Sequence, residues 1–255
     1  MNEDYTLNPA LANIRIVLIE TSHPGNIGAI ARAMKNMGLS QLVLVKPKEF
    51  PSSVASARAS SASDILNGAR VVDSLDEALV GTKLVFGASA RLRKVSWPQV
   101  DVRETAKMAI ETADEAEVAL VFGRENSGLT NAEMDKCHYL AHIPSNPTYC
   151  SLNISAAVQV FSYECLMASQ IQSVHSKNDR SKLASTDQLE GFYEHLFQTL
   201  QDIEFLDPDK NARFMRRMRR MFNRTELDVK EIDILRGILS ASQRKAEKAG
   251  KHEDV

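Results

Sequence analysis

Six short apolar segments recur along the first 145 residues of this 255-residue chain and constrain its fold more than any other feature. Several are apolar almost throughout, as strands are when helices cover both faces of a sheet. The stretches between them carry helical signals, including capping boxes at 74–77 and 130–133. The sequence therefore predicts an α/β domain with a mainly parallel sheet. The expected strands are 14–20, 41–45, 70–72, 83–89, 118–122 and 139–143.

The rest of the chain changes character. A long helix is expected over about 152–173, where apolar residues recur at helical spacing. Three further helical segments follow, at 186–201, 209–222 and about 228–245. We therefore predict an α/β domain over residues 1–172, a polar linker over 173–185, a small helical domain over 186–245 and a disordered tail over 246–255.

Composition excludes several classes of protein. No apolar run approaches the roughly 18 residues that a membrane span needs, so no membrane partner is expected. The N-terminal residues are polar and acidic, unlike a secretory signal. Cys137, Cys150 and Cys165 are odd in number and form no CxxC pair, which argues against a disulfide framework or a zinc site. A cytoplasmic protein without a metal is the expectation.

Three loops follow predicted strands, at the edge of the sheet where α/β proteins bind ligands. In the first, 20–34, Gly25 and Gly28 predict a tight turn before a helix, an arrangement that favours anions. The G-x-x-G spacing and the absence of an acidic residue after the next strand disfavour NAD. Arg32 lies on the helix after this turn, and taken alone it would be a solvated surface arginine.

The second and third loops are equally open to a structural interpretation when each is taken alone. In loop 122–130, Gly123 permits a close backbone approach to a ligand, while Arg124 and Glu125 are also compatible with a surface ion pair. In loop 142–158, small polar residues crowd the start of the long helix, which is also typical of simple N-capping.

Together, in order and character, these loops resemble the three signature motifs of the SpoU–TrmH branch of the SPOUT RNA 2′-O-ribose methyltransferases. The matching segments are Asn26-Ile-Gly28 with Arg32, Phe122-Gly-Arg-Glu125 with Gly128-Leu129, and Ile143-Pro-Ser with 151–155. Segments 74–79, 87–91, 136–139, 195–200 and 235–239 look like the tRNA cytidine/uridine 2′-O-methyltransferases of that branch, which extends the likeness into the helical domain.

This resemblance implies a trefoil knot in the C-terminal part of the α/β domain, with S-adenosylmethionine bound inside it. It also implies a homodimer. The small and apolar residues to which the resemblance assigns cofactor contact are Ala88, Ser89, Ala90, Gly123, Ile143, Cys150, Ser151 and Leu152. The implied reaction is methylation of the 2′-hydroxyl of cytidine or uridine at position 32 of the tRNA anticodon loop. Methylation of ribosomal RNA, or RNA binding without catalysis, is the alternative.

The resemblance gives the catalytic role to Arg32. A guanidinium is protonated at neutral pH, so two hypotheses remain. Arg32 loses a proton transiently in a dry site, or it holds a phosphate and stabilises the developing alkoxide. Asn26, Arg124, Glu125 and Asn153 are assigned to the loops and the bound ribose.

Residues 210–224 contain seven basic side chains and no acidic one. On a helix, Phe214, Met218, Met221 and Phe222 would form one apolar face. A row of arginines along its flank suits a phosphate backbone, although a solvated face of a helical bundle is the alternative. We predict that this row binds tRNA rather than DNA; it comprises Arg213, Arg217, Arg220 and Arg224.

Overall fold

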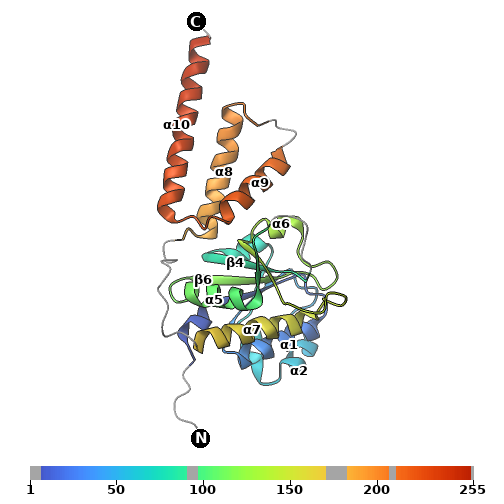
Figure 1. The fold of residues 1–255 in the computed structure, drawn as a ribbon. Helices are drawn as coiled ribbons and strands as arrows, with labels where there is room; N and C mark the ends of the chain where they lie inside the picture. The colour runs from blue at the N-terminus through green and yellow to red at the C-terminus, as the bar shows by residue number, and fades with distance from the viewer. Residues whose placement is uncertain (1–6, 91–96, 171–182, 207–210, 254–255) are drawn as a thin grey trace. The chain divides into compact units, whose positions relative to one another are not determined.

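The computed structural model describes residues 7–90, 97–170, 183–206 and 211–253 of the chain (Figure 1). It divides into two compact units, residues 1–181 and 182–255. Most of the predicted linker lies outside the described residues; its last three positions, 183–185, belong to the second unit.

A seven-stranded, wholly parallel sheet forms the centre of the first unit. The strand order is β3-β2-β1-β6-β4-β7-β5, which confirms the parallel sheet predicted from the sequence. The edge strand β5 was missed because only one of its three residues, Val100, is apolar. The knot stays a prediction. The strands are β1 (Ile14–Ile19), β2 (Gln41–Val45), β3 (Arg70–Val72), β4 (Thr82–Ala88), β5 (Gln99–Asp101), β6 (Glu117–Phe122) and β7 (Tyr139–His142).

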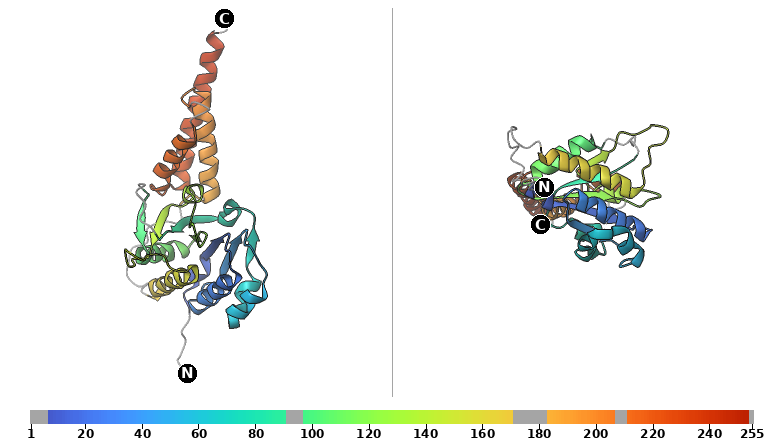
Figure 2. Two further views of the ribbon diagram at one scale, coloured as in Figure 1. Left: turned by 90° about the vertical axis from the view of Figure 1, so that its right-hand side faces the viewer. Right: turned by 90° about the horizontal axis from the view of Figure 1, so that it is seen from below.

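Helices cover both faces of this sheet, but unequally (Figure 2). Ile16 and Leu18 of β1 pack into the larger core, beneath α1 (Pro24–Asn36), α2 (Ser53–Ala59), α3 (Ser63–Asn67), α5 (Val102–Ala113) and α7 (Ile154–Gln170). Val17 and Ile19, on the opposite face of the strand, pack into a smaller core with α4 (Leu75–Leu79) and α6 (Asn131–Met134). Short 3-10 turns span Pro9–Asn13 and Ser60–Ala62.

The helix α1 begins earlier than the sequence predicted. His23 is its N-cap, Nδ1 of this side chain accepts from the amide of Gly25 at 3.0 Å, and Pro24 is the first helical residue. Gly25 and Gly28 therefore lie inside the helix, and the predicted turn at these glycines is wrong. A Cβ at Gly28 would lie 2.1 Å from the carbonyl oxygen of Ala55, so this glycine lets α1 and α2 pack closely.

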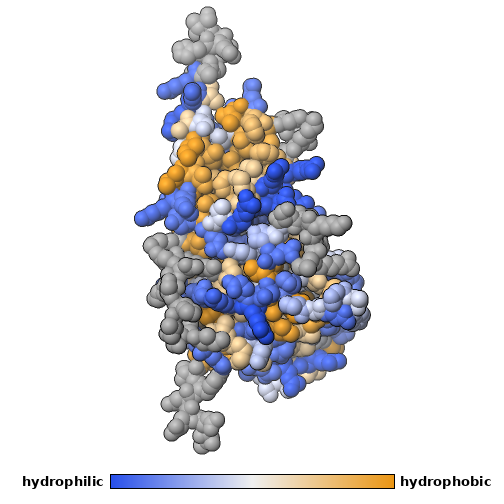
Figure 3. Space-filling view, viewed as in Figure 1, coloured by the Kyte–Doolittle hydropathy of each residue, from blue (hydrophilic) through white to orange (hydrophobic). Residues whose placement is uncertain are grey.

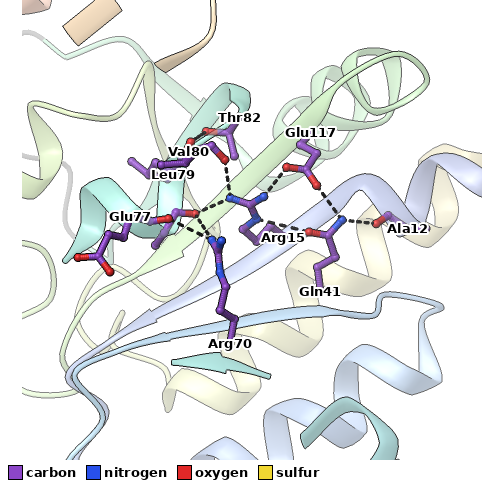
Figure 4. Close-up of polar contacts among 10 residues, drawn as sticks. Ala12, Arg15, Gln41, Arg70, Glu77, Leu79, Val80, Thr82 and Glu117 are labelled. Carbon is purple, nitrogen blue, oxygen red and sulfur yellow. Dashed lines mark hydrogen bonds and ion pairs between the residues drawn. The ribbon is translucent and has the colours of Figure 1, made fainter. Parts of the chain in front are cut away.

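A buried arginine holds the amino ends of the central strands together (Figure 4). Arg15 of β1 pairs with Glu117 of β6, and its Nη1 donates to the carbonyls of Ala78 at 2.5 Å and Val80 at 3.1 Å. The Ala78 carbonyl belongs to the last turn of α4 and the Val80 carbonyl lies just beyond it, where carbonyls lack helical partners. Burial lowers the pKa of Arg15, and the charge of Glu117 opposes that shift.

The second unit is a helical bundle of α8 (Thr186–Asp202), α9 (Asn211–Asn223) and α10 (Val229–Glu253). Ser185 caps α8 in a capping box with Gln188, as the sequence predicts. The helix α10 continues beyond residue 245, where the sequence placed a disordered tail, because the segment is rich in the helix formers Ala, Glu and Lys. Exposed apolar side chains gather on this unit, among them Ile234 and Ile238 of α10 (Figure 3).

The apolar face of α9 differs from the predicted one. Met215, Met218 and Phe222 pack against the core of the bundle, whereas Met221 is 37% exposed. These three side chains are partly buried on the side of α9 that faces α8, where the Phe192 and Phe222 rings lie 4.9 Å apart in an edge-to-face contact.

Candidate active site

A cavity of about 420 Å³ opens at the carboxyl ends of β4, β6 and β7. Its walls come mainly from three segments, 88–90 at the end of β4, 122–129 at the end of β6, and residues within 141–161 from β7 into α7, with Met134 of α6 added. This is the edge of a parallel sheet at which side chains and free backbone groups of adjacent strands converge. A cavity of this size holds a ligand of cofactor dimensions.

The loop after β6 is closed on itself beside this cavity. The amide of Arg124 donates to the carbonyl of Gly128 at 3.2 Å, and the amide of Gly128 donates back at 2.8 Å. Gly128 adopts a positive φ of 67°. A Cβ at Gly123 would lie 2.2 Å from the carbonyl carbon of Gly128, so only glycine permits this closure.

The loop after β7 is ordered by its own polar groups. Asn146 Oδ1 accepts from the amide of Thr148 at 3.0 Å and from its hydroxyl at 2.8 Å. Asn153 precedes α7, and its Oδ1 accepts from the amide and the hydroxyl of Ser155 at 2.8 and 2.7 Å. This is the N-capping that the sequence offered as a structural interpretation.

A hydrogen-bond chain joins all three loops. The Glu125 carboxylate accepts from the amide of Ser22 at 3.1 Å and from Nδ2 of Asn26 at 3.0 Å. Oδ1 of Asn26 accepts from Nδ2 of Asn153 at 3.3 Å. Burial acts to raise the pKa of Glu125, but the hydrogen bonds from its own backbone amide, Asn26 and Ser22 outweigh it and lower the pKa. The carboxylate is therefore ionised and acts as a fixed acceptor.

Arg124 points away from open solvent toward two carboxylates. Its Nε and Nη2 donate to both oxygens of Glu20, at 2.9 and 2.6 Å, and its Nη1 donates to both oxygens of Glu133, at 3.0 and 3.1 Å. The hydrogen bond from Arg124 is the main cause that lowers the pKa of Glu20, and that same bond raises the pKa of Arg124.

Arg32 lies about two turns along α1 from its N-terminus, and its side chain is exposed. It is not among the described residues that line the cavity of its own chain.

In the second unit, the arginines of α9 fall into two groups. Arg219 pairs with Glu190 of α8 at 2.5 and 2.8 Å, and its guanidinium carbon lies 4.4 Å from the ring centroid of Tyr193. The sequence did not reveal that a carboxylate pairs with Arg219, because Glu190 lies 29 residues from it along the chain. Arg213, Arg217 and Arg224 are exposed, and the last of these follows the end of α9.

The structure brings most of the predicted site residues together. All eight residues assigned to the cofactor line the cavity, as do Arg124 and Glu125. Sequence reasoning missed Glu20 and Glu133 as the residues that bind Arg124. Glu20 directly follows a buried strand, and Glu133 was recognised only as a helix-capping residue. Sequence reasoning also missed Thr148 and Tyr149, which line the cavity.

The described residues contain no group of three His, Cys, Asp or Glu side chains placed to hold a metal ion. His138 is instead part of the core, where its Nδ1 accepts from the amide of Val85 at 3.1 Å. None of the helices in the described part of the chain has the length and apolar character needed to cross a membrane.

Comparisons with known proteins match both units. Residues 13–163 match the model of the SpoU rRNA Methylase family, and residues 187–251 match that of the tRNA methyltransferase TrmJ C-terminal domain. A Pseudomonas aeruginosa protein named tRNA (cytidine/uridine/adenosine-2′-O-)-methyltransferase TrmJ is 51% identical, over 92% of this chain and 96% of its own. The Escherichia coli K12 tRNA (cytidine/uridine-2′-O-)-methyltransferase TrmJ is 48% identical, over 94% and 99%.

Solved structures agree with this assignment. The crystal structure of TrmJ from Z. mobilis ZM4 is 29% identical and superposes with a TM-score of 0.78, covering 89% of this chain and 97% of that one. A probable methylase from Haemophilus influenzae is 43% identical with a TM-score of 0.61, covering 94% and 99%.

Proposed function

This chain belongs to the TrmJ group of the SpoU methylase family, and we propose that it methylates the 2′-hydroxyl of cytidine or uridine 32 in the tRNA anticodon loop. The class of reaction is that of the named relatives, 2′-O-methylation of tRNA with S-adenosylmethionine as methyl donor. The nucleotide number and the roles of individual residues are the finer part of the proposal. The observation that supports it best is the convergence of all eight residues assigned to the cofactor on one cavity.

The cavity fits S-adenosylmethionine in size and chemistry. Its walls are small and apolar at Ala88, Ala90 and Leu152, and the exposed backbone of loop 122–129 offers hydrogen-bonding groups. Gly123 and Ser151 would hold the ligand largely through main-chain atoms. Bound there, S-adenosylmethionine would supply the methyl group: the ribose 2′-oxygen would bond to the methyl carbon as the carbon–sulfur bond breaks, and the hydroxyl proton would pass to solvent.

The chain's own groups orient the reactants. The hydrogen-bonded chain of Glu125, Asn26 and Asn153 fixes the relative positions of the three loops, and alignment of the reacting atoms supplies much of the rate. Asn26 and Asn153 also have amide groups at this edge that suit the ribose.

Arg32 supplies positive charge to the substrate. Its exposure in a single chain favours the role of holding a phosphate and stabilising the developing alkoxide over that of a base in a dry site. Because Arg32 is outside the described lining of its own cavity, we infer a homodimer in which the partner's Arg32 completes each site.

The exposed arginines of α9 provide a second contact with tRNA. Arg213, Arg217 and Arg224 are exposed, which leaves their charge available to phosphates, whereas Arg220 is only partly exposed and its Nε is buried. Charge reversal at Arg217 and Arg220 should weaken tRNA affinity at least tenfold at moderate salt and leave cofactor affinity unchanged. The control is Arg219→Gln. Because Arg219 pairs with Glu190, this variant should lower the stability of the helical bundle and change tRNA affinity little. Equal tRNA affinity in the charge-reversed variant would refute this surface.

The test of function is nucleoside mass spectrometry. Unmodified tRNA is incubated with the protein and methyl-labelled S-adenosylmethionine, and the label is mapped by nuclease digestion. Labelled 2′-O-methylcytidine or 2′-O-methyluridine at position 32 is expected, and the same digest detects adenosine if it is also a substrate. Label only on ribosomal RNA would move the activity to the alternative substrate. Absence of both label and cofactor binding would leave a non-catalytic RNA-binding protein.

Arg32 variants test the mechanism. Arg32→Ala should lose at least a hundredfold in turnover with little change in cofactor affinity. Arg32→Lys should retain part of the activity if charge is what matters, and almost none if the planar fork is required. Full turnover by Arg32→Ala would contradict both hypotheses for this residue.

Because tRNA is the substrate, we place the protein in the cytoplasm.

A further inference from the structure

The guanidinium of Arg124 is largely occupied by carboxylates. All three guanidinium nitrogens donate to carboxylates, two to Glu20 and one to Glu133, at 2.6 to 3.1 Å. The side chains are 24% exposed for Arg124, 44% for Glu20 and 14% for Glu133. A bidentate pair of this kind is strongly directional, so it fixes the orientation of the groups it joins. This geometry argues against the substrate contact predicted from the sequence.

Both carboxylates are anchored at functional junctions. Glu20 follows β1 directly and has a positive φ of 47°, a conformation that a non-glycine residue adopts only when its surroundings impose it. Its amide donates to the carbonyl of Val45 at 2.8 Å. Glu133 is the third residue of the capping box that starts α6, and its Oε2 also accepts from the amide of Thr130 at 2.7 Å. Arg124 therefore ties the entry to α1 to the start of α6.

Two consecutive side chains of the cavity loop reach the same neighbouring segment. Arg124 binds Glu20, and Glu125 binds the amide of Ser22 and the side chain of Asn26. The segment 20–26 leads directly into α1, the helix that carries Arg32. A ligand that contacts the backbone of 122–129 therefore contacts a loop that is joined by hydrogen bonds from two of its residues to the segment that leads into α1.

We propose that Arg124 is a positioning residue that couples occupancy of the cofactor cavity to the placement of α1 and its Arg32. The proposal rests on the proposed function for the identity of the ligand, but the coupling itself is a property of the loops. Arg124 and Glu20 transmit the position of the cavity loop to the entry of α1, and Glu133 holds the guanidinium at the angle that reaches Glu20. Glu125 carries the remaining part of the link.

Hydrogen exchange with and without S-adenosylmethionine tests this coupling without requiring turnover. In the wild type, cofactor should slow exchange of amides in both 122–129 and 20–36. In Arg124→Gln, protection of 122–129 should remain, and protection of 20–36 should fall at least threefold. Arg124→Lys keeps the positive charge but cannot bind both carboxylates as the guanidinium does. Its protection of 20–36 should lie between that of the wild type and that of Arg124→Gln. Arg103→Gln is the matched control, because the Arg103 side chain is 84% exposed and its contact with Glu164 of α7 is 3.6 Å long.

Kinetics gives the second measurement. Arg124→Gln should lower kcat on tRNA at least tenfold while changing the cofactor Kd less than threefold, and Glu20→Gln added to it should have little further effect, since both remove one link. Unchanged kcat with unchanged protection of 20–36 would overturn the proposal, as would loss of kcat and cofactor affinity in proportion to lost thermal stability. If the wild type fails to methylate tRNA, but protection of 20–36 by cofactor is present in it and lost in Arg124→Gln, the proposed function is refuted and the coupling still holds.

Discussion

The two ends of the β1–β6 strand pair are each closed by an arginine and a glutamate, and the two closures differ in surroundings. At the amino end, Arg15 of β1 pairs with Glu117 of β6; its side chain is 6% exposed, and carbonyls of the α4 turn hold it as well. At the carboxyl end, Glu20 after β1 pairs with Arg124 after β6; their side chains are 44% and 24% exposed and lie beside a cavity.

This difference shows how one pairing motif serves stability at one edge and function at the other. Arg15 is buried, although Glu117 is 35% exposed, and loss of the Arg15 side chain removes a donor from the carbonyls of Ala78 and Val80. The half-exposed pair is screened by water, so its energy is small, and its contribution is the geometry of a loop. We therefore expect variants of the pair at the amino end to change stability, and variants of the pair at the carboxyl end to change turnover.

The largest expected effect is at the amino end. Arg15→Met should lower the free energy of unfolding by about 3 kcal/mol, because Glu117 loses its cation and the carbonyls of Ala78 and Val80 lose a donor. Urea denaturation measures the loss, with Arg103→Gln as an exposed control expected to be nearly neutral. Turnover by the folded fraction should be unchanged; a variant that keeps its stability and loses turnover would break the comparison.

Gly123→Ala should have the next largest effect, this time on the ligand. The added Cβ would lie 2.2 Å from the backbone of Gly128, so the loop must open and the cavity must change shape. We expect cofactor affinity, measured by calorimetry, to fall by about tenfold, with a smaller loss of stability than in Arg15→Met. Gly191→Ala in α8 is the control, since its Cβ would meet nothing within 4 Å and should be neutral or slightly stabilising. Normal affinity in Gly123→Ala would mean that loop closure is dispensable.

The smallest expected effect is the pH dependence of the stability that the Glu20–Arg124 pair contributes. Glu20 has a lowered pKa, chiefly through its hydrogen bond from Arg124, so its stabilising contribution is complete above its unfolded pKa of about 4.3 and is lost as pH falls through the lower folded value. Thermal unfolding of the wild type and Glu20→Gln should differ by less than about 1 kcal/mol at pH 7, and the difference should shrink between pH 5 and pH 3. A difference that grew on acidification would contradict this pairing.

Local sequence predicted much of the site because its parts are local. Strand ends, glycines and capping residues lie within a few positions of one another, so loops 122–130 and 142–158 were identified as following predicted strands, and the resemblance then assigned their residues. Glu20 was not predicted to bind Arg124, because it lies 104 residues away and only the parallel pairing of β1 with β6 brings them together. Glu133 lies nine residues from Arg124, but its capping role gave no sign that it also binds the guanidinium. Glu190 escaped notice beside Arg219 for the same reason.

The sequence by itself determined the parallel sheet, the helical second part of the chain and the three loops at the carboxyl edge, since hydrophobic period and turn residues act over short distances. Tertiary structure decided which arginines are occupied and which are exposed. A sequence shows that Arg15, Arg124, Arg217 and Arg219 are all cations; only packing shows that three are bound by carboxylates while Arg217 remains exposed. The physical reason is that burial and charge pairing depend on residues far apart in the chain.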